Sequence, residues 1–391
     1  MLQFRVGRLV RSLRFTRGAL LATFCCLPFM GGCSAPLEDA DRESGDEGEE
    51  EDESGGDGAG ARSPDFTASD AGATGGAANV ADAAMAADAT TPTDVGRGPT
   101  ASDARAGTPP TKPANMLYVA VGWGGRRTSS TDGVTWANEQ AEARPGGDDN
   151  NLLRGVGYGA GLFVAVGGGP NIRMLVTRDG RTWTRPNHPS GQWLGGVAYG
   201  NGIWVAVGGL GRRMMSTDGM TWRDVGGSGS HLRSVAFANG RFVAAGSGLC
   251  TSTTDGQQWT RAVACGSNAE RVAGGGGRWV VVPYAGRSFA SSSDGQTWST
   301  GSLPSDSRNG VAYAYDRFYV SASAGLLTSR DGMQWQTQAS TGLSVLAFDG
   351  YDKLLGAQNG TLKVSGNGST WTTGNPSGNS IMGIAAGPLS P

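Results

Sequence analysis

The stretch Met215-Ser216-Thr217-Asp218-Gly219-Met220-Thr221-Trp222 contains a motif that occurs seven times in the chain. Its pattern is Ser or Thr, any residue, Asp-Gly, any residue, Thr or Gln, and Trp. The last copy, Ser-Gly-Asn-Gly-Ser-Thr-Trp, has Asn367 in place of Asp. The seven tryptophans are 47, 39, 37, 39, 37 and 36 residues apart. A repeat of about 40 residues is typical of the blades of a β-propeller.

The motif predicts a tight turn between two strands. Adjacent Asp and Gly favour a type I′ turn, because both central residues of that turn need a positive φ. The Asp and Ser or Thr side chains can also bond backbone N–H groups within the turn, and the Trp ring can pack against the neighbouring repeat. We therefore assign structural roles to the motif positions Asp132, Asp179, Asp218, Asp255, Asp294, Asp331 and Asn367, and to Trp136, Trp183, Trp222, Trp259, Trp298, Trp335 and Trp371.

A second turn precedes each motif. In the third repeat Asn201-Gly202 separates two apolar runs, and the pattern predicts four short antiparallel strands near 194–199, 203–208, 213–217 and 221–225. The first repeat begins with its second strand at Met116–Gly122, whereas an apolar stretch at 381–387 follows the last motif. Because a closed ring exposes no sheet edge, we expect this C-terminal strand to complete the first blade. The sequence thus predicts an all-β, seven-bladed β-propeller of four-stranded antiparallel blades over residues 115–391.

The motif resembles the Asp-box, or bacterial neuraminidase repeat, of sialidase-like and photosystem-assembly-factor-like propellers. The usual Asp-box is Ser-x-Asp-x-Gly-x-Thr-Trp, and here Asp and Gly are adjacent, so each copy is one residue shorter. The resemblance covers residues 116–387 and implies a propeller fold. It implies no particular activity, because in this family the box is a structural turn of enzymes and non-enzymes alike.

The N-terminus has the features of an export signal. Five arginines precede an apolar run at 18–30, which is too short to cross a bilayer as a helix. The run ends in Met30-Gly31-Gly32-Cys33, which resembles a bacterial lipobox and makes Cys33 the expected lipidation site; an ordinary cleaved signal peptide is the alternative. Residues 1–32 are then a signal peptide, and Ser34 resembles the pattern that sorts lipoproteins to the outer membrane, facing either the periplasm or the cell surface.

Residues 33–114 form a linker rich in Ala, Gly, Thr and Pro, with 18 acidic and 5 basic residues. Such a composition does not fold and stays extended, so we expect a disordered tether. The alternative is that its densest acidic run, 49–53, binds cations. The propeller holds 22 basic and 16 acidic residues, and this net positive charge favours anionic partners without pointing to nucleic acid.

Two cysteines, Cys250 and Cys265, remain in the predicted propeller. They flank Asp255-Gly256 of the fourth motif, so that hairpin pairing should place them nearly opposite each other. An exported compartment permits a disulfide between them. Two free thiols are the alternative, and the register decides whether the geometry of a disulfide fits.

The residues that catalysis would need are sparse. Only two histidines occur and no Cys/His cluster has metal-ligand spacing, so we expect neither a metal nor another cofactor. No G-x-S-x-G elbow is present. A glycosidase needs two placed carboxylates, and the propeller has only the glutamates Glu139, Glu142 and Glu270, of which Glu270 could pair with Tyr284 in a sialidase-type site. We therefore favour a protein without enzymatic activity.

The predicted topology gathers loops of several repeats on one face, and these loops carry arginines and aromatic residues. Arginine suits the recognition of carboxylate, phosphate or sulfate, and tryptophan suits stacking on sugars or apolar groups. The alternative is a solvated rim whose arginine stems cover the strand ends. The candidate ligand-binding face consists of Trp123, Arg126, Arg127, Arg173, Trp193, Arg212, Arg213 and His231.

Two functions are consistent with these features. The first is a membrane-anchored, monomeric binding module for a protein, a glycan or an anionic component of the cell envelope. The second is a divergent sialidase-like glycoside hydrolase. Paired carboxylates over the centre of the ring would favour the hydrolase, whereas carboxylates confined to turns would favour the binding module.

Overall fold

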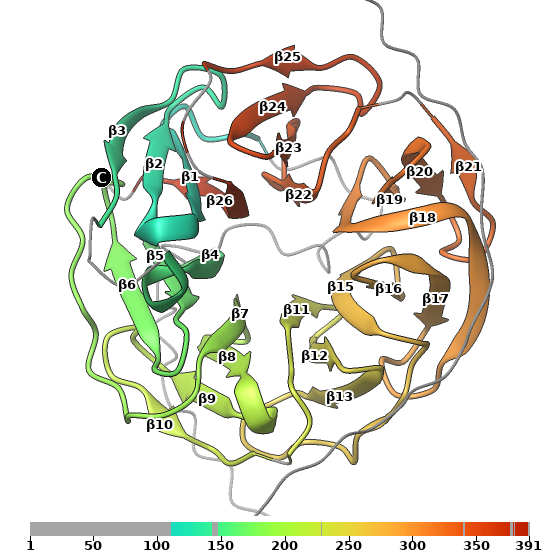
Figure 1. Cartoon of the computed structure of the whole chain (residues 1–391), viewed down its shortest axis with the longest axis horizontal. Helices are drawn as coiled ribbons and strands as arrows, with labels where there is room; N and C mark the ends of the chain where they lie inside the picture. Colours follow the sequence, from blue (N-terminus) through green and yellow to red (C-terminus); the bar gives the residue numbers. More distant parts are fainter. Residues whose placement is uncertain are drawn as a thin grey trace, which may run out of the picture. The chain divides into compact units, whose positions relative to one another are not determined.

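The computed structural model describes residues 111–142, 148–227, 229–338, 341–375, 378 and 380–389, all within one compact unit. The predicted signal peptide 1–32, the lipidation site Cys33 and the tether up to residue 110 lie outside the described residues. Figure 1 shows that the sheets of this unit surround a common centre, each running outward from an inner strand.

Four sheets have the four antiparallel strands that the repeat predicts. One of them joins the two ends of the described chain, in the order β26 (Ile381–Pro388), β1 (Met116–Gly122), β2 (Arg127–Ser130) and β3 (Ala137–Gln140). The third repeat forms β7 (Leu194–Gly200), β8 (Ile203–Gly208), β9 (Arg213–Ser216) and β10 (Arg223–Asp224). The fourth forms β11 (Ser234–Ala238), β12 (Arg241–Gly246), β13 (Leu249–Thr253) and β14 (Val263–Ala264), and the last forms β22 (Val345–Phe348), β23 (Leu354–Gln358), β24 (Thr361–Ser365) and β25 (Thr372–Thr373).

The second repeat has three strands, β4 (Leu153–Gly159), β5 (Leu162–Gly167) and β6 (Arg173–Thr177). Its fourth place is taken by a single bridge between Val176 and Thr184. The chain then leaves this sheet and joins the next one, where Asn187 forms a parallel bridge with Thr221 of the third repeat. Short 3-10 helices lie at η1 (Trp123–Gly125), η2 (Asp148–Asn151) and η3 (Gly209–Gly211).

The fifth and sixth repeats share one seven-stranded sheet, which consists of β15 (Ala269–Gly275), β16 (Arg278–Pro283), β17 (Gly286–Ser292), β18 (Ser299–Ala314), β19 (Arg317–Ala322), β20 (Gly325–Ser329) and β21 (Gln336–Thr337). Its middle strand, β18, is 16 residues long. Residues 299–307 of β18 pair with β17, and residues 307–314 pair with β19. One continuous strand is therefore the outer strand of the fifth repeat and the inner strand of the sixth.

The turns between the first two strands of the repeats match the prediction. Asn201 and Gly202 have φ values of 49° and 76°, and Asn239 and Gly240 have values of 49° and 73°. A positive φ at both central residues is the requirement of a type I′ turn.

The motif turn is different, and the prediction of a type I′ Asp-Gly turn is wrong. Among its residues only the glycine has a positive φ, which is 73° at Gly219. The Ser216 hydroxyl donates to Asp218 at 2.9 Å and accepts from the Gly219 N–H at 2.8 Å. Asp218 in turn accepts from the backbone N–H groups of Met220 and Thr221, both at 2.8 Å. The serine hydroxyl and the aspartate carboxylate therefore shape a loop that is longer than a two-residue turn. The next strand begins only after the tryptophan.

Each motif packs against the preceding repeat. Trp222 of the third repeat lies among buried side chains of β5 and β6 in the second, and a Cβ placed on Gly219 would lie 2.6 Å from Leu162. In the same way, Trp136 of the first repeat shares a core cluster with Leu355 of the last. The motif therefore contributes to the contact between sheets as well as to the turn.

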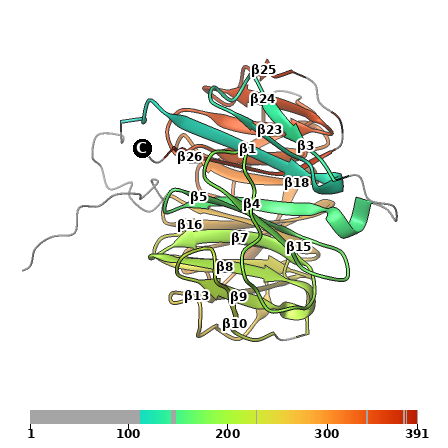
Figure 2. The same ribbon diagram turned by 90° about the vertical axis from the view of Figure 1, so that its left-hand side faces the viewer.

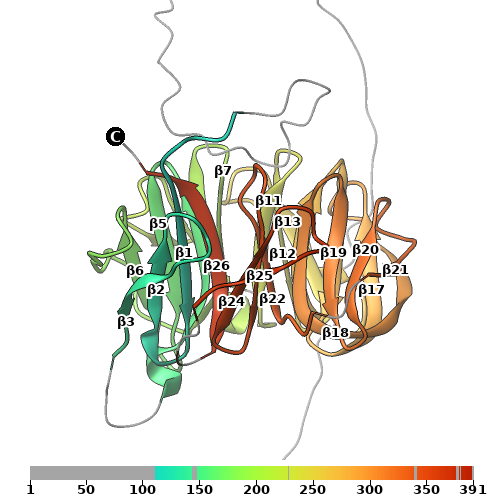
Figure 3. The ribbon, with the colours of Figure 1, turned by 90° about the horizontal axis from the view of Figure 1, so that it is seen from above.

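The inner strands follow one another around the centre. Contacts join β26 to β4, β4 to β7, β7 to β11, β11 to β15, β15 to β18, β18 to β22 and β22 to β26. Figure 2 shows the inner strands β4 and β7 one after the other. β26 pairs with β1 from Pro388 opposite Met116 to Ile381 opposite Gly122, and Figure 3 shows the dark red β26 beside the teal β1.

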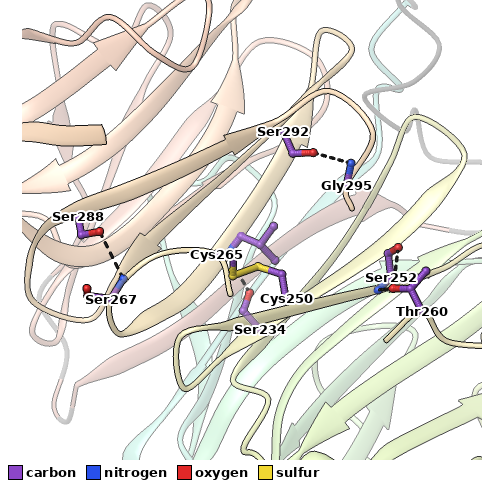
Figure 4. Close-up of a disulfide and its surroundings, with 10 residues drawn as sticks. Ser234, Cys250, Ser252, Thr260, Cys265, Ser267, Ser288, Ser292 and Gly295 are labelled. Carbon is purple, nitrogen blue, oxygen red and sulfur yellow. Dashed lines mark hydrogen bonds between the residues drawn. A yellow bond between two sulfur atoms is a disulfide. The ribbon is translucent and has the colours of Figure 1, made fainter. Parts of the chain in front are cut away.

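Cys250 and Cys265 form a disulfide, with a Cα–Cα distance of 5.7 Å. Cys250 lies in β13 opposite Val263 of β14, and Cys265 follows β14 directly. Figure 4 shows the bond between the two segments. Both residues are fully buried, so the disulfide is part of the core of the fourth repeat.

The chain enters the described unit at the turn between β22 and β23. The Lys112 ammonium forms ion pairs with Asp349 and Asp352 in that turn. The Tyr118 hydroxyl donates to the same Asp349 at 3.0 Å, and the Asn115 amide donates to the Leu389 carbonyl at 2.8 Å. Lys112 and Tyr118 thus tie the start of the described chain to the last repeat, and Asn115 ties it to the end of β26.

Asp294→Ala should lower the free energy of unfolding by about 1 kcal/mol, because the turn loses an acceptor equivalent to a helix cap. Asp294→Asn should cost less, since Asn367 accepts the equivalent hydrogen bonds at 2.8 and 2.9 Å in the last motif. Urea unfolding at neutral pH measures both variants. An Asn variant as unstable as the Ala variant would contradict this account of the turn.

The same residue predicts a pH dependence. Hydrogen bonds from the backbone of Thr297 and Gln296 lower the pKa of Asp294 to about 2, below an unfolded value of about 4. The stabilisation is therefore complete above pH 4 and is lost as the pH falls through 2. The difference in stability between wild type and Asp294→Asn should narrow over this range, whereas a constant difference would exclude a role for the charge.

Deletion of residues 381–391 should expose the edge of β1 and promote self-association, because an uncovered strand pairs with other chains. Light scattering after size-exclusion chromatography measures the oligomeric state. Deletion of residues 390–391 alone, which lie beyond β26, is the matched control. A monomeric truncation that lacks β26 and melts at the wild-type temperature would show that this strand is dispensable.

Candidate anion-binding site

A cavity lies at the centre of the sheets, at the ends of the inner strands. Two adjoining parts of about 590 and 690 Å³ share lining residues that include Trp123, Arg154 and Arg271. We call this continuous space the central mouth. Among the described residues, its charged lining consists of four arginines and one carboxylate, namely Arg154, Arg233, Arg271, Arg308 and Glu270.

Irregular pairing at the start of the inner strands places several of these side chains. On β4 the register passes over Arg154 between Leu153 and Gly155. β15 has the same shift at Glu270, and β18 has it across Arg308 and Asn309. A β-bulge of this kind re-aims the side chain of the extra residue. Equivalent positions of repeats far apart in sequence therefore supply one cavity.

Trp193 holds two of the arginines. The guanidinium carbon of Arg154 lies 4.8 Å from the centre of a Trp193 ring, and that of Arg233 lies 5.2 Å from it. Arg154 also donates to the Gly168 carbonyl at 3.3 Å. Each cation–π contact contributes on the order of 1 kcal/mol. Trp193 therefore positions two positive charges in the central mouth.

Arg271 completes a cluster of like charges. It donates through Nε to the Asn309 amide oxygen and through Nη1 to the Arg233 carbonyl, both at 3.0 Å. Burial lowers the pKa of the Arg271 guanidinium; Glu270 raises it, and the positive charges of Arg233 and Arg154 lower it further. Glu270 forms an ion pair with Arg233 at 3.3 Å. The cluster thus brings three arginines and a single carboxylate together.

The outer lining of the central mouth is more accessible. Arg308 is exposed and makes no hydrogen bond or ion pair with any described residue. Tyr284 is 62% exposed, and its hydroxyl has no partner in the described part of the chain. Trp123 is half-buried. One guanidinium and two aromatic side chains are therefore available to a ligand.

The predicted arginine rim needs a correction. Arg126, Arg127 and Arg173 are only 1%, 7% and 9% exposed. Arg126 pairs with Glu139 at 2.6 Å, and Arg127 and Arg173 share Glu142. Burial, together with the charges of neighbouring arginines, lowers the pKa of Arg173 to about 10. These guanidinium groups meet glutamates of the first repeat instead of lining an exposed surface.

The other two predicted arginines are also engaged within the protein. Arg212 forms an ion pair with Asp224 at 2.9 Å, and its side chain is 11% exposed. The guanidinium of Arg213 lies over the ring of Trp259 at 4.9 Å. Both therefore cover the third repeat and its contact with the fourth.

The predicted aromatic residues lie closer to the central mouth. Trp123 and Trp193 line it. The His231 ring lies 5.4 Å from that of Trp193, and its Nδ1 is 3.0 Å from the Leu210 backbone N–H, which donates to it. His231 is thus placed beside Trp193 and outside the lining.

Sequence reasoning missed the arginines of the central mouth, because each lies beside an apolar strand that reads as core. A signal was nevertheless present. Leu153-Arg154-Gly155-Val156 and Leu232-Arg233-Ser234-Val235 occupy the same place in their repeats. Aligning the repeats would have brought these two arginines together.

The described residues contain no group of three or more His, Cys, Asp and Glu side chains that could hold a metal ion. The helices in this part of the chain are all too short to cross a membrane.

Glu142→Gln should lower the free energy of unfolding by about 3 kcal/mol, because it leaves two buried guanidinium groups without their carboxylate. Asp306→Asn is the matched control. Its partner Arg287 and Asp306 itself are both 57% exposed, so the loss there should be about 0.5 kcal/mol or less. Urea unfolding compares the two. Equal small losses would show that Arg127 and Arg173 do not depend on Glu142.

No known family model matches the sequence, and no curated protein matches it. Solved structures with partial similarity to the chain include three examples. A structure of YCF48 bound to D1 peptide is 21% identical, with a TM-score of 0.44, over 55% of this chain and 77% of the other. YCF48 from Cyanidioschyzon merolae is 16% identical, with a TM-score of 0.41, over 56% and 84%. The Pan2 WD40 domain of Neurospora crassa is 11% identical, with a TM-score of 0.47, over 69% and 88%.

Proposed function

We propose that this chain is a lipid-anchored, seven-bladed β-propeller that binds an anionic ligand in its central mouth and has no catalytic activity. The observation that carries the proposal is the cluster of Arg154, Arg233 and Arg271 around one carboxylate. Like charges that the fold holds close together cost free energy. An anion in the central mouth would offset that cost.

The count of seven blades and the closure of the ring are part of this proposal. Seven motifs recur along the chain. The seven-stranded sheet divides into two four-stranded halves that share β18. The pairing of β26 with β1 and the succession of inner-strand contacts support closure by the C-terminal strand.

Membrane attachment rests on the N-terminal sequence. Cys33 follows a short apolar run, and the acidic linker would hold the propeller away from the bilayer. The disulfide between Cys250 and Cys265 agrees with an exported protein, because such bonds persist in oxidising compartments. We place the protein in the bacterial outer membrane as a lipoprotein, acting as a monomer on a protein, glycan or envelope component.

Glycoside hydrolysis is the second candidate, because Glu270 and Tyr284 both line the central mouth. The usual mechanism needs two carboxylates about 5–10 Å apart. Glu270 is the one carboxylate among the described residues of the lining, and it pairs with Arg233. This arrangement favours binding. Release of nitrophenol from aryl glycosides of acidic sugars, lost in Glu270→Gln, would favour the hydrolase instead.

Arg271→Gln should weaken the binding of sulfate at least about tenfold, because a charge-assisted hydrogen bond contributes about 1.5–3 kcal/mol. Calorimetric titration at constant ionic strength measures the affinity, which should also fall as added salt screens the charges. Arg330→Gln, an exposed change in the turn of the sixth motif, is the control. The site would be refuted if wild type bound no sulfate, or if wild type, Arg271→Gln and Arg330→Gln bound it with equal affinity.

A further inference from the structure

The charges that line the central mouth do not balance. Arg233, Arg271 and the exposed Arg308 are opposed by Glu270 alone among the described lining residues. These three arginines therefore carry an excess of two positive charges. A ligand with a single negative charge would leave half of this excess uncompensated.

We propose that the central mouth recognises a phosphate monoester group carried by a small soluble molecule. This inference rests on the proposed anion-binding function. A phosphate monoester has close to two negative charges at neutral pH and three acceptor oxygens. It therefore matches both the excess charge and the number of guanidinium groups, which arrive from separate strands.

Other anions match the lining less well. A carboxylate or a sulfate ester carries one negative charge, so either leaves at least one of Arg233, Arg271 and Arg308 without a counter-charge. The free N–H groups of these arginines also suit a tetrahedral group better than a planar carboxylate. Arg271 uses Nε and Nη1 within the protein, which leaves its Nη2 for a ligand, and Arg308 has all its donors available.

The shape of the central mouth favours a small soluble ligand. Its two parts, of about 590 and 690 Å³, lie in the range of sites for small molecules, about 300–1,000 Å³. Trp123 and Tyr284 line it together with the arginines. Their rings offer apolar surface, and the indole N–H and the phenol hydroxyl offer polar edges, for the organic part of the ligand.

The test compares methyl phosphate, methyl sulfate and acetate by calorimetric titration of the full mature protein at pH 8 and pH 5, at constant ionic strength. At pH 8, methyl phosphate should bind about tenfold tighter than methyl sulfate, because the two differ by one charge at the same shape. At pH 5 this difference should close, because the phosphate loses its second charge near pH 6. Methyl sulfate keeps its charge over this range, so it controls for changes in the protein between the two pH values.

Variants assign the effect to the central mouth. Arg271→Gln and Arg308→Gln should each weaken methyl phosphate at pH 8 about tenfold and narrow its advantage over methyl sulfate. Arg330→Gln should leave both affinities unchanged. Loss of affinity in Arg330→Gln equal to that in the other two would overturn the assignment.

The remaining outcomes separate this inference from the function on which it rests. Equal affinities for methyl phosphate and methyl sulfate at pH 8 would overturn the phosphate assignment and leave anion binding intact. No binding of any of the three anions would overturn both. Arg271-dependent binding to vesicles that contain phosphatidic acid, without binding of methyl phosphate, would overturn the soluble ligand and point to a lipid headgroup.

Discussion

The contact between each motif turn and the preceding sheet is the interaction on which the arrangement of strands depends. Gly219 has a φ of 73°, which favours glycine, and its neighbour Leu162 leaves no room for a Cβ. Trp222 reaches back to donate to the Gly219 carbonyl at 3.0 Å while its ring enters the adjacent core. A rigid polar loop and a large apolar side chain thus fix how one sheet sits on the next.

Because the packing fixes the position of each sheet relative to the next, the central mouth can bring like charges together. Arg154, Arg233 and Arg271 lie just before or among the first residues of the inner strands β4, β11 and β15. None of these strands can shift without disturbing the packing of its neighbours. The free energy of apolar packing elsewhere therefore outweighs the repulsion among the guanidinium groups. Sites that break a local rule and are stabilised by the surrounding fold are characteristic of function.

The repeat made the strands predictable, because alternating apolar runs and Asn-Gly turns act locally. The third repeat forms β7, β8 and β9 within one residue of the predicted bounds. The site was less predictable, because it depends on which side chains the bulges redirect and which arginines find a carboxylate. Arg173 reads as a surface residue in sequence yet is buried against Glu142, whereas Arg154 reads as a neighbour of core residues yet lines the cavity.

The entry of the chain at β1 has a mechanical consequence. Lys112 attaches the first described residues to the last repeat, Asn115 attaches them to the end of β26, and the chain continues directly into β1 at Met116. A force applied to the N-terminal side would act along β1, perpendicular to the hydrogen bonds that join it to β26 and β2. Both ladders would then resist in shear, with many bonds strained at once, instead of opening one pair at a time. The strand where the two ends of the described part meet is therefore the one best placed to withstand pulling.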